Sequence, residues 1–226
     1  MICPYHGWAY NLGGGLRGIA NRDTFPPMQA EKWGLKPLEM EIWNGLVFIR
    51  FQTGPQPAVA EILARFDDEI APYDLANMVP TDSNSMDDLL AVNWKSVRDV
   101  DNEGYHVRQA HPGLHQLYGD GYFDEPYANG TSRSVGTFNE AYGHRWSVRK
   151  YREILPEAEN LPLHQRRQWI YFGMFPNFVL GLYPDSVIYY QEVPQSATQT
   201  VQRGMCYRRR EESREMKAAR YLSGRI

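Results

Sequence analysis

The stretch Asn93–Pro112, NWKSVRDVDNEGYHVRQAHP, is the part of the sequence that decides the fold. It brings two histidines, His106 and His111, close in sequence to a carboxylate, Glu103. Two histidines and one carboxylate form a known kind of iron site, in which the remaining metal positions stay open for other molecules. The segment therefore predicts a metal site.

The spacing of the two histidines requires a break in the helix. Residues five positions apart on a regular α-helix point about 140° away from one another, because each residue turns by about 100°. His111, however, precedes Pro112, and the residue before a proline disfavours helical dihedral angles. We therefore predict a strand or entry segment through Val92 and Trp94, then a helix from about Lys95. Pro112 and the glycine after it are expected to end this helix and to turn His111 back toward His106.

Other residues near this pair are weaker candidates for metal ligands. His115 follows His111 by four positions, but a Pro-Gly pair between them interrupts a regular helical face. A place in a pocket wall or on the surface is the alternative for His115. Asp120 and Asp124 fall in residues 118–135, which we interpret as a long loop, and Asp185 follows a proline in a predicted turn.

A second candidate site lies in the string CPYHGWAY at residues 3–10. A tight turn would bring the thiolate of Cys3 and the imidazole of His6 to one metal. In a Rieske [2Fe–2S] cluster, two cysteines bind one iron and two histidines bind the other. Gly7 would let the backbone approach such a cluster closely. A cysteine and a histidine near a terminus, with no metal role, are the alternative.

Both segments resemble one family, the Rieske non-haem iron oxygenases of the aromatic-ring-hydroxylating dioxygenase type. CPYHGW is similar to the second half of the family's cluster motif, and N-W-K followed by E-x-Y-H-x-x-x-x-H-P is similar to the iron motif of its catalytic alpha subunit. The resemblance implies that Cys3 and His6 bind a Rieske [2Fe–2S] cluster and that His106 and His111 bind Fe(II). It implies that Glu103 links this iron to a cluster in a neighbouring subunit through hydrogen bonds to a histidine at each end.

The remaining ligands are expected outside this sequence. The first Cys-x-His pair of the cluster would precede Cys3, and the third iron ligand, an Asp or Glu, would follow residue 226. We therefore expect a fragment that is truncated at both ends and inactive by itself. One departure from the family pattern lies near the ligands. Arg98 stands where relatives carry an acidic residue and Asp99 where many carry Asn, so altered hydrogen bonding in the pocket is expected.

The apolar pattern predicts an α+β protein. Asn44-Gly45 between apolar runs predicts a β-hairpin within Glu39–Phe51, and helical spacing from Val59 to Ile70 predicts a helix. A final helix is predicted from Glu211 to the end. Strands are predicted at Ser134–Glu140, Trp169–Leu182, Ser186–Val193 and Thr198–Tyr207.

Pro55 and Pro57 mark a boundary between two domains. We assign residues 1–52 to the C-terminal part of a Rieske β-domain and residues 53–226 to the catalytic domain. The resemblance implies that the latter has a helix-grip fold of the START/Bet v1-like type. In that fold a curved antiparallel sheet curls around a long helix and encloses a cavity.

Composition excludes several classes of protein. A net charge of −3 over 226 residues gives no support for binding to nucleic acid or to a membrane surface. No run of apolar residues is long enough to span a membrane, and the N-terminus is unlike a signal peptide. Only two cysteines occur, Cys3 and Cys206, so a disulfide framework is not expected and a reducing cytoplasm is the default location.

The resemblance implies an oxidoreductase that consumes O2 and electrons to hydroxylate a ring, to monohydroxylate, or to remove N- or O-methyl groups. The implied partners are a small organic substrate, a reductase or ferredoxin, and further copies in a homotrimer, with or without a β subunit. Aromatic residues in Trp169–Leu182 and Ser186–Val193 would line the cavity and suit either a flat ring or a quaternary ammonium group. A non-catalytic module for hydrophobic ligands, or a pseudoenzyme, is the alternative. An electron-transfer Rieske ferredoxin is a second alternative. It would need no mononuclear iron site, so the segment E-x-Y-H-x-x-x-x-H-P argues against it.

Overall fold

The computed structural model of the chain describes residues 1–51, 54–140 and 143–226, and for residues 82–85 it describes the backbone alone. Two compact units can be distinguished. The first comprises Met1–Ile42 and Val47–Gln56, and the second comprises Trp43–Leu46 and Pro57–Ile226. The domain boundary predicted between residues 52 and 53 lies outside the described residues.

The first unit is built from short strands and turns. Strand β1 (Ala9–Tyr10) pairs antiparallel with β2 (Leu16–Gly18), and two 3-10 helices, η1 (Arg22–Thr24) and η2 (Ala30–Trp33), follow. The predicted hairpin forms from β3 (Glu39–Trp43) and β4 (Leu46–Arg50). Its turn residues Asn44 and Gly45 have φ values of 48° and 81°, in the left-handed region that Asn and Gly tolerate best.

The helix predicted from Val59 to Ile70 forms as a series of short pieces. These are α1 (Val59–Leu63), η3 (Ala64–Phe66), α2 (Asp67–Ile70), η4 (Ala71–Tyr73) and η5 (Leu75–Asn77). Leu63, Phe66 and Ile70 are buried, as their spacing predicted. The ring of Phe66 stacks on Phe172 of the sheet with 4.4 Å between the centroids, so this segment covers one face of the sheet.

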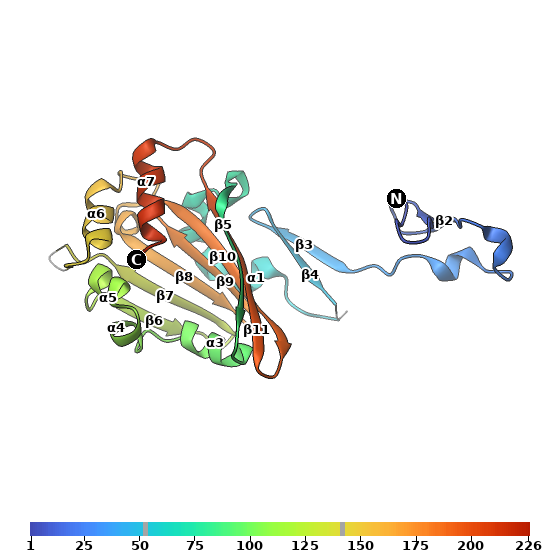
Figure 1. Cartoon of the computed structure of the whole chain (residues 1–226), viewed down its shortest axis with the longest axis horizontal. Coiled ribbons are helices and arrows are strands. Elements are labelled where there is room, and N and C mark those ends of the chain that lie inside the picture. The colour runs from blue at the N-terminus through green and yellow to red at the C-terminus, as the bar shows by residue number, and fades with distance from the viewer. Residues whose placement is uncertain (52–53, 141–142) are drawn as a thin grey trace. The chain divides into compact units, whose positions relative to one another are not determined.

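Seven strands form one curved antiparallel sheet, as expected (Figure 1). Strands β6 to β11 follow one another in chain order, and β5 joins at the edge beside β11. The strands are β5 (Val79–Leu90), β6 (Tyr122–Pro126), β7 (Thr131–Thr137), β8 (Gln168–Met174), β9 (Phe178–Tyr183), β10 (Ser186–Ser196) and β11 (Gln199–Arg208).

Several strand predictions were wrong, each for an identifiable reason. Residues 118–135 are not a long loop, because Asn129-Gly130 forms the turn of the β6–β7 hairpin, with Gly130 at φ 79°. Residues Trp169–Leu182 are not one strand, because the chain reverses around Pro176 between β8 and β9. Strand β5 was not predicted at all, since its run of polar and acidic residues lacks an alternating pattern.

Three helices pack on the other face of the sheet: α5 (Pro112–Tyr118), α6 (Trp146–Ile154) and α7 (Arg214–Ser223). Their shared core consists of Leu117, Tyr118, Val148, Tyr151, Trp169, Ala219 and Leu222. Helix α7 confirms the helix predicted near the C-terminus, whereas α6 was not predicted. The longest helix in the described part of the chain is α7, with ten residues. No described helix is long and apolar enough to cross a bilayer.

A buried carboxylate connects these helices to the sheet. Asp185 lies in the turn between β9 and β10, as predicted, but it is only 4% exposed. It accepts hydrogen bonds from the hydroxyls of Tyr151 at 2.5 Å and Ser223 at 2.8 Å. The Tyr151 hydroxyl in turn accepts from Nε1 of Trp169 at 3.0 Å. Burial raises the pKa of Asp185, and these donors partly offset that rise.

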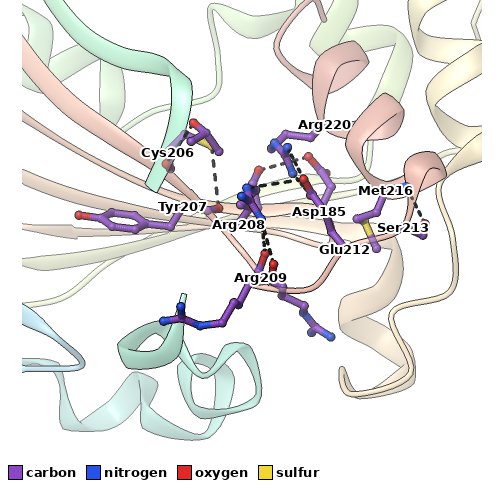
Figure 2. A network of polar contacts seen from close by, with 12 residues as sticks. Asp185, Cys206, Tyr207, Arg208, Arg209, Glu212, Ser213, Met216 and Arg220 are labelled. Atoms are coloured by element: carbon purple, nitrogen blue, oxygen red, sulfur yellow. Dashed lines mark hydrogen bonds and ion pairs between the residues drawn. The ribbon is translucent and has the colours of Figure 1, made fainter. Parts of the chain in front are cut away.

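An ion-pair cluster fixes the start of α7 (Figure 2). The carboxylate of Glu212 pairs with both terminal nitrogens of Arg220, one at 2.9 Å, and lies 3.6 Å from Nε of Arg208 on β11. The side chains of Glu212 and Arg220 are 11% and 9% exposed, so water screens this pair weakly. Helix α7 is therefore held to the sheet at both ends, by Glu212 and by Ser223.

Replacing Tyr151 by Phe removes one hydroxyl that serves two buried partners. Asp185 then loses a donor and Trp169 loses an acceptor, so the free energy of unfolding should fall by about 1–3 kcal/mol in urea denaturation. Tyr221→Phe, at an exposed position of α7, is the control and should change it by less than about 0.5 kcal/mol. Equal small effects at both positions would contradict a supporting role for this hydroxyl.

Candidate functional site

The site begins with helix α3 (Trp94–Asp101), which starts one residue earlier than predicted. Asn93 caps it, because its side-chain oxygen accepts a hydrogen bond from the N–H of Lys95 at 3.0 Å. The amide nitrogen of Asn93 also donates to the carbonyl oxygen of Ala197 at 2.8 Å. Of the two alternatives predicted for the segment through Val92 and Trp94, the strand is wrong: β5 ends at Leu90, and Trp94 is already helical.

The two histidines meet where the next helix breaks. Helix α4 (Val107–Ala110) ends before His111, whose φ of −121° and ψ of 70° are not helical, as its place before Pro112 predicted. Pro112 does not terminate the helical region, however. It is the first residue of α5, where a missing N–H costs nothing. The rings of His106 and His111 lie 5.1 Å apart between centroids.

Glu103 controls the orientation of the first histidine. Its Oε1 lies 2.6 Å from Nδ1 of His106, and its Oε2 accepts the backbone N–H of His106 at 3.2 Å. Desolvation acts to raise the pKa of Glu103, but these hydrogen bonds outweigh it and hold the pKa below its ordinary value. A carboxylate only accepts, so Nδ1 of His106 carries the proton and Nε2 keeps its lone pair for a ligand.

The turn that carries Glu103 is fixed from the β6–β7 hairpin. Asp124 accepts the N–H of Gly104 at 2.5 Å with one oxygen and the hydroxyl of Ser134 at 2.6 Å with the other. A side chain at Gly104 would overlap the ring of Tyr122, so only glycine fits there. Asp124 thus supports the turn that carries Glu103.

A cavity of about 160 Å³ opens beside the two histidines. Glu103, His106 and His111 line one side of it, and the aromatic wall consists of Tyr118, Tyr122, Tyr171 and Tyr190. The Tyr183 hydroxyl donates to that of Tyr171 at 3.2 Å, which ties this wall to the core behind it. The strands predicted to line a cavity do contribute, since Tyr171 lies on β8 and Tyr190 on β10.

Two imidazoles at the edge of a cavity suit a first-row metal ion, and the Glu103 contact gives His106 the correct protonation for binding it. The weaker candidates for metal ligands do not lie at this cavity. Its lining does not include His115, Asp120 or Asp185. Across the described residues, no three His, Cys, Asp or Glu side chains are arranged to hold a metal ion. The assignment of His106 and His111 to iron remains a prediction, which the arrangement of the two rings at one cavity fits.

Sequence reasoning missed a second buried carboxyl group beside the cavity. Glu192 on β10 is fully buried and lies near Asp101 of α3, whose Oδ1 accepts the Tyr190 hydroxyl at 3.2 Å. Burial and the neighbouring Asp101 raise the pKa of Glu192 to about 8, and burial also raises the pKa of Asp101. The only available signal was the alternation along β10, which places Glu192 on the same face as Tyr190.

The N-terminal candidates share one turn in the first unit. The N–H of Gly7 donates to the carbonyl oxygen of Cys3 at 2.9 Å, and the N–H of Cys3 donates to that of Trp8 at 2.8 Å. Gly7 has φ 72°, so the turn itself requires a glycine there. His6 is exposed and its ring contacts Tyr5. The assignment of Cys3 and His6 to a cluster remains a prediction.

Comparison with known proteins identifies the family. Residues 72–226 match the model of the ring hydroxylating alpha subunit (catalytic domain), and the chain belongs to this family. The glycine betaine monooxygenase oxygenase subunit of Chromohalobacter salexigens is 31% identical over 157 residues, which are 67% of this chain and 34% of that protein. The carnitine monooxygenase oxygenase subunit of Acinetobacter pittii is 28% identical over 213 residues, 89% of this chain and 51% of that protein. The chain thus spans a third to a half of these relatives.

The fold agrees with a solved structure. A quaternary ammonium Rieske monooxygenase, crystallised with an inhibitor, superposes with a TM-score of 0.75 at 20% identity. The match covers 100% of this chain and 57% of that chain. The likeness shows a shared fold that extends over both units of this chain.

Replacing Gly104 by Ala should displace the turn that carries Glu103, because the new methyl group overlaps Tyr122. We expect Fe(II) to bind about tenfold or more weakly in an anaerobic titration, as for other losses of support around a metal ligand. Gly224→Ala, where the nearest atoms would be 3.8 Å away, is the matched control. Unchanged affinity in Gly104→Ala would mean that this turn does not position the site.

Glu192 should make the protein less stable as the pH rises. Its folded pKa of about 8 exceeds the ordinary value of 4.5, so the folded state holds more protons between these values and loses stability as the pH increases through them. Glu192→Gln cannot ionise, so its free energy of unfolding should vary less across this window and exceed that of the wild type above it. The exposed Glu159→Gln is the control. Parallel pH profiles for wild type and Glu192→Gln would contradict the buried, protonated state.

Proposed function

We propose that this chain forms the iron-binding part of an oxygenase that oxidises a small organic substrate with O2. The observation that carries the proposal is the meeting of His106 and His111 at one cavity, with Glu103 bound to Nδ1 of His106. The family match supports it, since the matched region is a catalytic domain.

In this proposal His106 and His111 would hold Fe(II), which would supply the activation of O2. The chain's own residues do the rest. Glu103 keeps the proton of His106 on Nδ1, so that Nε2 faces the metal position. The wall of tyrosines excludes bulk water and orients the substrate beside the metal.

Glu103 also has a second proposed role, in electron transfer. Its side chain is 43% exposed, so one face of the carboxylate remains accessible while the other holds His106. A histidine ligand of a Rieske [2Fe–2S] cluster, supplied by a neighbouring subunit, is the proposed second partner. Cys3 and His6 are the proposed cluster ligands of this chain. Because electrons would then pass from the cluster of one subunit to the iron site of its neighbour, we propose a homotrimer, with or without a β subunit.

The cavity favours a small charged substrate over a flat arene. Arg98, Asp101 and Glu103 contribute ionisable groups to a cavity of about 160 Å³, whereas an arene pocket needs an apolar lining. Glycine betaine and carnitine monooxygenases are among the relatives, which supports monooxygenation or demethylation of such a compound. A reductase or ferredoxin in the cytoplasm is the proposed electron donor.

Replacing Glu103 by Gln in the full-length protein separates metal binding from electron transfer. Gln keeps the size of the side chain but loses the charge that pairs with imidazole. We expect both metal centres to load, while substrate-dependent O2 consumption falls by a factor of about 100 or more, because the bridging hydrogen bonds are weakened.

Two further variants complete this test. His106→Ala should lose Fe(II) as well as turnover, whereas His115→Ala should keep both, since His115 lies outside the cavity lining. Turnover that survives in Glu103→Gln would refute the bridging role. Normal Fe(II) loading in His106→Ala would refute the proposed oxygenase site and favour a binding module.

A further inference from the structure

Arg98 is a buried cation in the wall of the cavity, and one of its terminal nitrogens has no hydrogen-bond acceptor in the part of the chain that the structure describes. The residue is 6% exposed, and Nη1 is buried with no hydrogen-bond acceptor among the described residues. Asp101 and Glu192 interact with it electrostatically, but neither accepts a hydrogen bond from Nη1. A buried guanidinium nitrogen without an acceptor is costly, so an acceptor is expected to arrive from outside the chain.

The fold makes room for this guanidinium. It lies over Gly173 of β8, where any side chain would overlap both Nη2 of Arg98 and the hydroxyl of Ser132. Arg98, Ser132 and Gly173 all line the cavity that contains His106 and His111. Gly173 is the one glycine of β8, and it lies where the guanidinium of Arg98 packs against the strand.

The carboxyl groups of Asp101 and Glu192 act on Arg98 electrostatically, but neither accepts a hydrogen bond from its Nη1 in the described part of the chain. Oδ1 of Asp101 accepts the Tyr190 hydroxyl instead. Nη1 of Arg98 therefore remains available to an acceptor on a bound molecule.

We propose that Arg98 is the anchor for a carboxylate group of the substrate. A guanidinium binds a carboxylate through two parallel hydrogen bonds, which fix both the position and the orientation of the bound molecule. Arg98 would hold the acidic end of a small compound, so that the remainder extends along the tyrosine wall toward the histidines. This inference rests on the proposed function only in taking the same cavity as the substrate site.

Two probes that differ mainly in the carboxylate test the proposal directly. Glycine betaine and choline share a trimethylammonium group, but choline has a hydroxymethyl group in place of the carboxylate. Titration calorimetry with the metal-free chain should give an affinity for glycine betaine at least about tenfold higher than for choline. Equal affinities, or no binding of glycine betaine, would overturn the proposal.

Variants of Arg98 assign the preference to this residue. Arg98→Met should abolish the preference for glycine betaine, and Arg98→Lys should retain part of it, since an ammonium keeps the charge but loses the fork. The exposed Arg149→Gln on α6 is the control and should keep the full preference. A preference that persists in Arg98→Met would place the anchor elsewhere.

Thermal melting distinguishes this role from a purely structural one. A guanidinium whose acceptor is supplied by the ligand contributes little to the stability of the ligand-free protein. Arg98→Met should therefore melt at the same temperature as the wild type or higher. A lower melting temperature would indicate a structural role and count against the proposal. Because these measurements need no iron, a failure to bind Fe(II) would refute the oxygenase proposal and leave the carboxylate anchor standing.

Discussion

The hydrogen bond between Glu103 and Nδ1 of His106 is the contact on which the site depends most. It determines which imidazole nitrogen carries the proton in the neutral ring, and it holds that ring in place. The same carboxylate also binds the backbone N–H of His106, so ring and main chain are fixed together. The second imidazole reaches the same cavity only because His111 leaves the helical conformation before Pro112. The placement of the two imidazoles therefore follows from one carboxylate and one proline.

The rest of the structure holds these two local features in place. Asp124 and Tyr122 on β6 fix the turn at Gly104, and the sheet that carries β6 is covered by a core shared with α5, α6 and α7. Asp185 and Glu212 hold α7 onto this core. The cavity therefore has one wall of strands and one wall of short helices, and the histidines come from the helical wall.

The local chemistry of the site was predictable, because it depends on neighbouring residues in the chain. The break before Pro112, the hairpin at Asn44-Gly45 and the burial of Phe66 all follow from short-range rules on dihedral angles and spacing. Long-range pairing was not predictable in the same way. Strand β5 has no alternating pattern of apolar residues that would reveal it. Its pairing with β11, rather than its own sequence, determines where it lies. Glu192 was missed because its burial beside Asp101 joins β10 to α3, which are far apart in the sequence.

The measurement that tests the central claim most directly is the X-ray absorption spectrum of the Fe(II)-loaded protein. Imidazole rings give a multiple-scattering pattern from which the number of histidine ligands can be counted. If His106 and His111 both bind the iron, the wild-type spectrum should fit two imidazoles, and the spectrum of His111→Ala should fit one. A wild-type spectrum that fits no imidazole, or an unchanged count in His111→Ala, would contradict the account.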